Sequence, residues 1–388
     1  MHQRDLMPSA LPPSPRAERP DPEPRPPGSP VRIVRYYPRA VVGDGGITRS
    51  VWHHSVELAG RGAEIVIVYD EGGAPATPEG VRVVPMRHAG WPWRVPVGME
   101  DVLGEADALV LHSAWVLHNV RAGAVARRRG VPYVLEPRGA YDPRIVARKR
   151  WRKRAWWLAW ERRLVEGARA IHLFFETERE HLDALGYRGD VIVAPNGVEI
   201  HDEFRWDGGS GGYLLWYGRF DPEHKGIDLL LRALHRLPPA ERLPLRLHGP
   251  ESRAGGKEAM RRLVADLGLE PWVTVGEPVF GDVKYGLLAR AVGFVYPSRW
   301  EGFGNAAAEA ASVGVPVLAT PYPLGRYLAE REAAFLSPTD PAGLAEGLRA
   351  LSGPAAAAVG ERAARLVREE FTWARVTRSW LDQLKALL

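Results

Sequence analysis

The chain alternates between short apolar runs and longer stretches whose apolar residues recur at helical spacing. From residue 31 onward the apolar runs are rich in β-branched and aromatic residues, which favour strands. Strands that alternate with helices are typical of βαβ units and of a parallel sheet. We therefore expect a first series of strands at residues 31–36, 63–68, 108–112, 133–136, 170–174 and 191–194.

A second series of the same kind follows a linker at residues 197–212, where closely spaced glycines interrupt any regular element. The predicted fold class is therefore α/β, with two doubly wound domains that face each other across a cleft. Ligands of open α/β sheets bind beyond the carboxyl ends of the strands, so a shared ligand is expected between the domains. The second series of strands is expected at residues 213–217, 245–248, 273–275, 293–296 and 315–319.

The two ends of the chain differ from these domains. Residues 1–30 are crowded with Pro, Arg and acidic residues and cannot bury enough apolar surface to order the chain, so we expect a disordered tail. Apolar residues recur at helical spacing in residues 372–388, which predicts a final helix packed on the body. The expected domains are residues 31–204 and 205–371.

Composition narrows the classes of function. The chain has 388 residues, 45% of them hydrophobic, and a formal charge of +5, which suits anionic ligands such as nucleotides or lipid headgroups. Because Cys is absent, disulfides, thiolate nucleophiles and Cys-ligated zinc are excluded. No run approaches the roughly 18 apolar residues of a membrane span, and the N-terminus lacks an apolar leader segment. We expect a cytoplasmic protein.

The segment with the clearest chemistry runs from the strand at 293–296 through Pro297-Ser-Arg-Trp-Glu-Gly-Phe-Gly304 into an Ala-rich helix. Gly302 and Gly304 allow close backbone approach just before the helix N-terminus, where free amides and the helix dipole favour a phosphate. Glu301 and Glu309 are eight positions apart, which puts them about 80° out of phase if both were helical. We therefore place Glu301 in the loop and Glu309 in the second helical turn, where both can accept hydrogen bonds from sugar or ribose hydroxyls.

This segment resembles the retaining glycosyltransferases of family 4, whose hallmark is a Glu, seven residues and another Glu. The resemblance implies the GT-B fold, with two Rossmann-like domains, of which residues 31–204 would bind the acceptor and residues 205–371 the nucleotide-sugar donor. It also implies that Glu301 contacts the donor sugar and Glu309 the nucleotide ribose, while the backbone of Phe303, Gly304 and Asn305 approaches the sugar and diphosphate. The alternative from the residues alone is an amphipathic helix with two surface carboxylates.

A second cluster, Gly218-Arg-Phe-Asp-Pro-Glu-His-Lys-Gly226, follows the first strand of the second domain. Arg offers a fork of donors matched to phosphate and Lys a compact charge, so together they suit a diphosphate. The resemblance implies that Arg219 and Lys225 neutralise the departing nucleoside diphosphate. A solvated Asp-Pro turn with incidental basic residues is the alternative.

A third cluster lies at the start of the first domain. The segment Gly43-Asp-Gly-Gly-Ile-Thr48 is not the Gly-x-Gly-x-x-Gly dinucleotide fingerprint, because position 48 is Thr, and this disfavours an NAD enzyme. The resemblance places Gly45 and Gly46 against the donor phosphates or the acceptor, while a plain loop before a helix is the alternative. The turn Pro195-Asn-Gly-Val198 also matches the family.

His112 ends a strand at the lip of the first sheet. The resemblance implies that it hydrogen-bonds a sugar hydroxyl and helps to stabilise positive charge at the anomeric carbon. A lone His is more often structural, and we interpret His53, His54 and His118 in that way.

The most unusual composition is the basic, tryptophan-rich segment at residues 148–160. Trp with Lys and Arg is typical of helices that bind anionic membranes, although single-stranded nucleic acid uses the same residue types. The third interpretation is a helix that buries Trp157 and Leu158 and exposes a basic face. Since Glu136-Pro-Arg-Gly139 resembles bacterial polysaccharide-assembly transferases, we expect peripheral contact with the inner face of the membrane and no nucleic-acid partner.

We therefore predict a retaining glycosyltransferase that moves a sugar from a nucleoside diphosphate to an acceptor hydroxyl in polysaccharide, lipid-linked glycan or glycosylated-metabolite synthesis. No Asp-x-Asp motif occurs, and the resemblance implies a GT-B enzyme that holds the diphosphate without a divalent metal, so we expect no metal and no cofactor. The alternatives are a sugar-phosphate or storage-polysaccharide synthase of the same fold, and a non-catalytic protein that binds membrane or nucleic acid. The family's Gly-rich loop after residue 320 is replaced by Pro321-Tyr-Pro-Leu-Gly-Arg326, so donor-sugar contacts there do not transfer.

Overall fold

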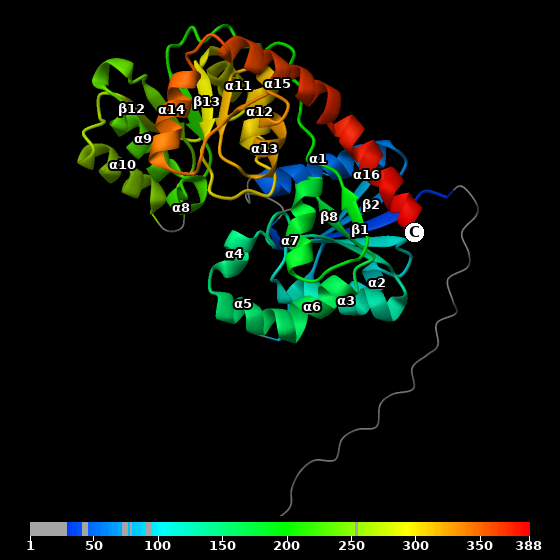
Figure 1. Ribbon diagram of the computed structural model, residues 1–388. Coiled ribbons are helices and arrows are strands. Elements are labelled where there is room, and N and C mark those ends of the chain that lie inside the picture. Colours follow the sequence, from blue (N-terminus) through cyan, green and yellow to red (C-terminus); the bar gives the residue numbers. More distant parts are fainter. Residues whose placement is uncertain (1–28, 41–45, 72–76, 78–79, 91–94, 253–254) are drawn as a thin grey trace, which may run out of the picture. The chain divides into compact units, whose positions relative to one another are not determined.

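The first sheet is parallel throughout and has the order β3-β2-β1-β6-β7-β8-β9 (Figure 1). Successive side chains of its central strands alternate between two apolar cores: Val34 and Leu111 belong to one, and Ile33 and Val110 to the other. A sheet buried on both faces is what near-continuous apolar strands predict. Its strands are β1 (Arg32–Ala40), β2 (Glu64–Glu71), β3 (Val81–Pro85), β6 (Ala108–His112), β7 (Tyr133–Glu136), β8 (Ala170–Leu173) and β9 (Val191–Val193).

The second sheet is also parallel and has the order β12-β11-β10-β13-β14-β15. One large apolar core surrounds it, in which Trp216, Phe294 and Leu318 are fully buried. Its strands are β10 (Leu214–Tyr217), β11 (Leu245–His248), β12 (Val273–Gly276), β13 (Gly293–Tyr296), β14 (Val317–Ala319) and β15 (Phe335–Leu336). A separate antiparallel hairpin pairs β4 (Arg87–Ala89) with β5 (Val95–Val97).

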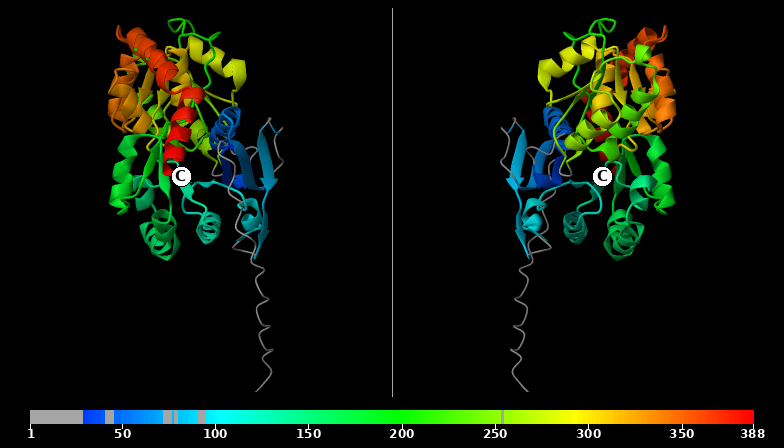
Figure 2. Two further views of the ribbon diagram at one scale, coloured as in Figure 1. Left: turned by 90° about the vertical axis from the view of Figure 1, so that its right-hand side faces the viewer. Right: turned by 90° about the vertical axis from the view of Figure 1, so that its left-hand side faces the viewer.

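Helices connect the strands of both sheets (Figures 1 and 2). Those of the first half are α1 (Gly46–Gly60), α2 (Met99–Val102), α3 (Leu117–Arg129), α4 (Pro143–Ala147), α5 (Arg150–Trp156), a π-helix (Trp157–Glu161), α6 (Arg162–Glu166), a 3-10 turn (Glu176–Glu178) and α7 (Arg179–Ala184). Those of the second half are α8 (Pro222–Lys225), α9 (Ile227–Arg236), a 3-10 turn (Pro239–Glu241), α10 (Gly256–Asp266), α11 (Gly281–Arg290), α12 (Asn305–Val313), α13 (Pro323–Ala329), α14 (Pro341–Ala350), α15 (Ala356–Glu370) and α16 (Trp373–Leu387).

The last helix, α16, follows the second sheet in sequence but packs on the first. It contacts α1 and β9, and its buried Trp380 and Leu384 share a core with Ile33 of β1. Just before it, the backbone N–H of Val198 donates to Phe371 (2.6 Å), so the two chain segments that connect the sheets lie side by side. The amphipathic spacing of α16 thus serves to join the end of the chain to its beginning.

This computed structural model describes residues 29–40, 46–71, 77, 80–90, 95–252 and 255–388, and the part from Val31 to Leu388 forms one unit. The predicted disordered tail lies outside the described residues as far as residue 28, and so does Gly45. The predicted α/β class with two doubly wound parallel sheets is confirmed, and β6, β7, β11 and β13 have the predicted bounds.

Candidate functional site

The turn between β13 and α12 brings the backbone to a helix N-terminus. Gly304 precedes the helix with a φ of 100°, a left-handed conformation that glycine adopts without strain, and a Cβ there would lie 3.0 Å from the Tyr322 ring. A Cβ on Gly302 would lie 2.6 Å from the carbonyl oxygen of Arg138. Both glycines are therefore required by close packing, and the first amides of α12 form a place that favours an anion.

Glu301 lies in the loop before α12, as the phase argument predicted, and is 9% exposed. The ammonium of Lys225 lies 2.6 Å from its Oε1 and donates to the hydroxyl of Tyr296 (3.0 Å). Burial alone would raise the pKa of Glu301, but Lys225 and His224 outweigh burial and hold this pKa below its usual value. Glu301 is therefore a buried carboxylate that keeps its charge.

Glu309 lies in the second turn of α12 and has its own lysine. The Nζ of Lys284 on α11 lies 2.8 Å from Oε2 of Glu309, and the hydroxyl of Tyr217 donates to the same oxygen (2.7 Å). On the other carboxylate oxygen, Arg49 of α1 lies 3.9 Å away. Burial lowers the pKa of Lys284, although Glu309 opposes this shift. Each of the two carboxylates thus forms an ion pair with a buried or half-buried lysine.

Arg219 follows β10 and is exposed. Within the described part of the chain, no hydrogen bond or ion pair fixes its guanidinium, so the fork of donors is available to a ligand. Lys225, by contrast, is engaged with Glu301. Together with Lys284 these groups give the region around the N-terminus of α12 a positive character suited to a diphosphate.

Asn305, the first residue of α12, connects the two halves of the chain. Its side-chain oxygen accepts from Asn196 (2.9 Å), and its Nδ2 donates to Ser50 (3.2 Å) and, at 3.4 Å, to the carbonyl of Gly46. A Cβ on Gly46 would lie 3.2 Å from this Nδ2. The predicted site residues Gly46 and Asn305 are therefore in contact, whereas the Asn305 side chain is occupied by protein partners.

Phe303 points away from the turn. Its ring is 4% exposed and stacks on Phe175 with 5.8 Å between centroids. The side chain is therefore engaged in the core, and the predicted contact of the Phe303 backbone with the sugar and diphosphate stays a prediction.

His112 is fully buried in a charged cluster. Its Nδ1 lies 2.9 Å from Oε2 of Glu136, and its Nε2 accepts from Nε of Arg35 (3.3 Å). Burial lowers its pKa to about 4, against the opposing effect of Glu136, so the ring is neutral near pH 7. The structure thus places both ring nitrogens of His112 against protein groups, and its predicted contact with a sugar remains a prediction.

The same charged cluster is connected to the turn between β13 and α12 by a backbone contact. Arg138 pairs with Glu136 (2.6 Å) and has a left-handed φ of 53°. The next residue, Gly139, packs so tightly that a Cβ there would lie 2.6 Å from Cα of Gly302. The charged cluster of the first half therefore supports the loop that carries Glu301.

The side chains around the N-terminus of α12 form a group that we call the constellation: Glu301, Glu309, Lys225, Lys284, Tyr217 and Tyr296. Sequence reasoning missed several of its members. Lys284 carries no motif and would be read as a surface lysine of α11, and Tyr217 and Tyr296 would be read as core aromatics at strand ends. His224, whose ring stacks on Trp300 (5.1 Å), lies inside the predicted Arg219-to-Lys225 cluster and was passed over. Only the positions of Tyr217 and Tyr296, at the carboxyl ends of adjacent strands, could have indicated them.

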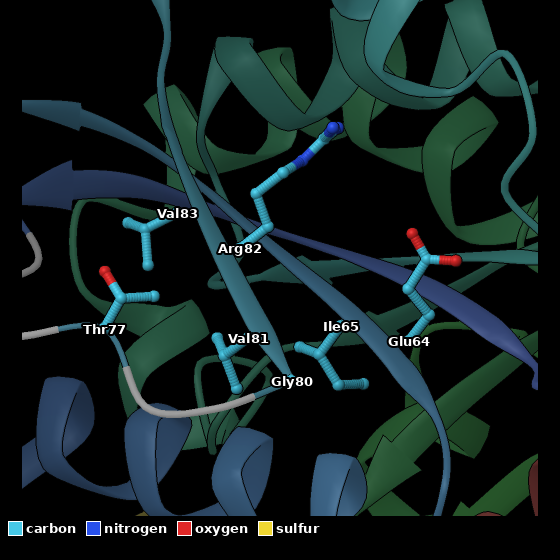
Figure 3. A pocket seen from close by; sticks show the side chains of 7 residues that line it. All are labelled: Glu64, Ile65, Thr77, Gly80, Val81, Arg82 and Val83. Carbon is cyan, nitrogen blue, oxygen red and sulfur yellow. The ribbon is translucent and has the colours of Figure 1, made fainter.

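A separate hollow of about 430 Å³ lies over β2 and β3 (Figure 3). Ile65 and Val81 are partners in the strand register and lie together there, while the long Arg82 side chain extends away. None of its lining residues belongs to the constellation around α12, and the hollow gathers no catalytic groups. Its lining residues are Glu64, Ile65, Thr77, Gly80, Val81, Arg82 and Val83.

Two sequence families match the two halves of the chain. Residues 45–197 match the family described as "Glycosyl transferase 4-like domain", and residues 211–353 match "Glycosyl transferases group 1". The second match contains the Glu301-to-Glu309 segment and the Arg219-to-Lys225 cluster.

Curated relatives match over shorter regions. O-antigen chain mannosyltransferase B of Escherichia coli is 40% identical over 110 residues, which is 28% of this chain and 28% of the relative. D-inositol 3-phosphate glycosyltransferase of Frankia alni is 32% identical over 242 residues, 54% of this chain and 56% of the relative. The matched regions span little more than half of these relatives at most.

Solved structures match nearly the whole chain. Sucrose-phosphate synthase from Thermosynechococcus elongatus superimposes with a TM-score of 0.75 at 19% identity, over 92% of this chain and 99% of that chain. HepE from Anabaena, in complex with UDP-glucose, has a TM-score of 0.74 at 17% identity, with coverages of 92% and 99%. At these identities the likeness establishes the fold, which is GT-B.

Proposed function

We propose that this chain, which belongs to the group 1 glycosyltransferases, transfers a sugar from a nucleoside diphosphate to an acceptor hydroxyl with retention of anomeric configuration. The observation that carries the proposal is the pair of lysine-bound carboxylates, Lys225 with Glu301 and Lys284 with Glu309, on either side of the N-terminus of α12. A nucleotide sugar has hydroxyls at its two ends and a diphosphate between them. The two ion pairs supply both kinds of group that such a ligand needs, carboxylates for its hydroxyls and cations for its diphosphate.

In this proposal the donor rearranges the ion pair between Lys225 and Glu301. Lys225 turns toward the diphosphate with Arg219 and the first amides of α12, while Glu301 accepts hydrogen bonds from the donor sugar. As the bond to the anomeric carbon breaks, negative charge grows on the departing diphosphate. Fixed donors stabilise that charge in the transition state more than in the ground state, which is where they accelerate a reaction most.

Glu309 takes the ribose hydroxyls in this proposal, held in place by Lys284 and Tyr217. His112 acts through the cluster with Glu136 and Arg138 that supports the loop of Glu301, and also offers its ring toward the donor sugar if the cluster opens. Neither the role of Glu309 nor that of His112 requires a covalent nucleophile from the protein. This is in keeping with front-face substitution through an oxocarbenium-like state.

The donor site is proposed to work without a divalent metal. Arg219, Lys225, Lys284 and the helix dipole supply positive charge where other transferases use an ion, and no Asp-x-Asp motif offers ligands for one. Turnover is expected to continue in EDTA. Complete dependence on added Mg²⁺ would contradict this part of the proposal.

The experiment is release of nucleoside diphosphate from a panel of uridine and guanosine diphosphate sugars, beginning with UDP-glucose, the ligand of the HepE structure. Turnover is expected with at least one donor, and Glu301→Gln is expected to abolish it. Glu330→Gln, at an exposed position on the end of α13, is the matched control and should retain full activity. Absence of turnover with every donor, together with tight binding of RNA or membrane, would favour a non-catalytic binding protein.

The acceptor is proposed to be a lipid-linked or soluble glycan intermediate. One curated relative is named for O-antigen chain synthesis and another for inositol phosphate glycosylation, so both acceptor types belong in the test. Transfer to a lipid-linked acceptor would support a role in polysaccharide assembly, whereas transfer to sugar phosphates alone would favour the synthase alternative.

The basic, tryptophan-rich segment is proposed to attach the protein to an anionic membrane surface at the cytoplasmic face. No helix in the described part of the chain is long and apolar enough to cross a bilayer. The segment forms α5 and most of the π-helix, and its outward side chains include Trp151 (71% exposed) and Leu158 (62% exposed). The alternative of a helix that buries both Trp157 and Leu158 is therefore wrong for Leu158. Trp157 packs inward, with its ring centroid 6.3 Å from that of Trp115.

Exposed large apolar side chains beside Arg150, Arg152 and Arg154 combine apolar insertion with attraction to acidic headgroups. Sedimentation with phosphatidylglycerol vesicles at low salt is expected, and sedimentation with neutral vesicles is not. The double variant Trp151→Ser with Leu158→Ser should lose binding, while Leu336→Ser, an exposed apolar position on β15, should keep it. Failure of the unaltered protein to bind anionic vesicles at low salt would end the proposal.

A further inference from the structure

Three side chains from separate elements meet at the carboxyl edge of the first sheet, outside the constellation around α12. Asp70 lies at the end of β2, His88 on β4, and His118 in the first turn of α3. Their candidate ligand atoms all lie within 4.8 Å of one another. The sequence separates these residues widely, so the fold rather than a local motif assembles the group.

Both oxygens of the carboxylate face imidazole nitrogens. Oδ1 of Asp70 lies 3.0 Å from Nε2 of His88, and Oδ2 lies 2.7 Å from Nδ1 of His118. The two imidazole rings are tilted toward each other, with 5.1 Å between centroids. We infer that Asp70, His88 and His118 form a binding site for a divalent transition-metal ion of the zinc class.

The spacing suits such an ion. Bonds from Zn²⁺ to imidazole nitrogen and carboxylate oxygen are about 2.0–2.2 Å long, so neighbouring ligand atoms stand roughly 3 Å apart around it. The two carboxylate–imidazole separations, 3.0 Å and 2.7 Å, are close to this spacing, and all the candidate ligand atoms lie within 4.8 Å of one another. Imidazole and carboxylate together favour Zn²⁺, Co²⁺, Ni²⁺ or Fe²⁺, whereas Mg²⁺ and Ca²⁺ prefer ligand sets made of oxygen alone.

A hydrogen bond from a buried tyrosine orients the Asp70 carboxylate. The hydroxyl of Tyr36, which is fully buried on β1, donates to Oδ1 of Asp70 (2.8 Å). Such outer hydrogen bonds orient a ligating carboxylate and are a regular feature of metal sites. The Asp70 side chain is 4% exposed, His88 9% and His118 17%, so the ligands are largely buried while His118 leaves a path for an ion and its water.

The competing explanation is an aspartate that simply hydrogen-bonds two histidines and ties β4 and α3 to the sheet. In the described residues the ion pairs of Asp70 are with these two histidines, so no lysine or arginine neutralises it. Three converging protein ligands match the number that open zinc sites use, in which water takes the fourth position. Metal binding to this site is independent of the proposed donor chemistry and is measured separately from it.

The test is a calorimetric titration with ZnCl₂. The protein is tag-free and full-length, and it is treated with EDTA and desalted beforehand. A single ion is expected per chain, together with a raised melting temperature, because an ion that binds only the folded state stabilises it. His88→Ala and His118→Ala should each weaken binding at least tenfold. His235→Ala, an exposed histidine on α9, is the matched control and should bind as the unaltered protein does.

A second measurement separates coordination from simple hydrogen bonding. Bound Co²⁺ is expected to show the visible absorption of a site with nitrogen and oxygen ligands, and Tyr36→Phe should weaken binding by roughly 10–100-fold by loosening Asp70. The inference is overturned if the protein binds no Zn²⁺, or if binding survives both histidine substitutions. In either case the histidines only hydrogen-bond the aspartate.

Discussion

The two lysines of the donor constellation hold their carboxylates with nearly equal contacts, at 2.6 Å and 2.8 Å, yet the proposal gives them different tasks. Lys225 lies beside the place where charge develops, since its partner Glu301 belongs to the turn before α12. Lys284 lies on α11 and acts through Glu309, whose proposed contact is the ribose. The first task changes between ground state and transition state, and the second does not.

The two lysines are therefore expected to separate kinetically. Lys225→Met should lower kcat by roughly 10²–10³-fold, the usual cost of one electrostatic donor at a transition state. Lys284→Met should raise the donor KM by about tenfold with little change in kcat, because it removes binding common to both states. Steady-state kinetics with a soluble acceptor measures both. Equal losses of kcat in the two variants would contradict the assignment.

His112 makes a prediction about stability rather than activity. Its pKa is lowered from 6.5 to about 4 in the folded state because burial disfavours the imidazolium. The unfolded chain therefore takes up a proton on His112 as pH falls below about 6.5, while the folded chain does not until about pH 4. The free energy of unfolding that His112 contributes is complete above about pH 6.5 and falls as pH drops toward 4.

Between pH 6.5 and pH 5.0 this loss should amount to about 2 kcal/mol, from 1.36 kcal/mol per pKa unit. Urea unfolding of the unaltered chain and of His112→Asn at both pH values gives the comparison. The asparagine variant lacks the titrating group and should lose about 2 kcal/mol less than the unaltered chain over this interval. The same pH dependence in both proteins would show that His112 is not the group responsible.

At the scale of elements, the donor site depends on how closely two backbone turns approach. Gly139 after β7 and Gly302 before α12 are in contact because neither carries a Cβ. Gly139 also has a φ of 78°, and Gly130 at the end of α3 has a φ of 68° with no atom near its missing Cβ. Both glycines adopt a left-handed φ, but only Gly139 has neighbouring atoms where a Cβ would lie.

That difference provides a controlled substitution. Gly130→Ala is expected to cost about 1 kcal/mol of stability through its left-handed backbone alone, with activity unchanged. Gly139→Ala should cost more and also lower kcat, because the new Cβ displaces the loop of Glu301. Denaturant unfolding and donor turnover of the two variants are the measurements. Equal activity in both would mean that the loop of Glu301 does not depend on this contact.

The elements also show what the sequence could and could not predict. Strands such as β6 and β13 were predicted with their bounds because both faces are buried and their apolar runs are continuous. The two-residue β15, the edge strand β3 with Arg82 at its second position, and the small hairpin carry too little periodicity to be found. The turn with Glu301 and the phase of Glu309 followed from local spacing, whereas Lys284 and Tyr217 join them only through tertiary packing.

Two further features, the π-helix and the partners of His118, could be found only in the folded structure. The segment at residues 148–160 reads as an amphipathic helix, but its π-helix is set by Glu161, a buried carboxylate that accepts from Trp156 (2.9 Å) and Tyr141 (2.8 Å). The indole of Trp156 is thereby held toward Glu161, whereas Trp151 is exposed. His118 was interpreted as structural because it lacks the strand-end placement of His112, and its partners Asp70 and His88 are distant in sequence.

At the scale of the whole molecule, most of the proposed donor contacts come from the second sheet and its connections. The first half contributes Gly46, Asn196 and the turn after β7, which contact α12 and the loop before it. The last helix returns to the first sheet and shares its core. The halves that match two different sequence families are thereby joined around one turn, and binding of the acceptor by the first half stays a prediction.

The central claim is transfer with retention at a site formed by Glu301, Glu309 and their lysines. The most direct measurement is the anomeric configuration of the product, read by proton NMR from the reaction with the donor that the release assay identifies. A donor whose sugar is α-linked to the diphosphate, such as UDP-glucose, is expected to give an α-linked product. A β-linked product from that donor would contradict the account.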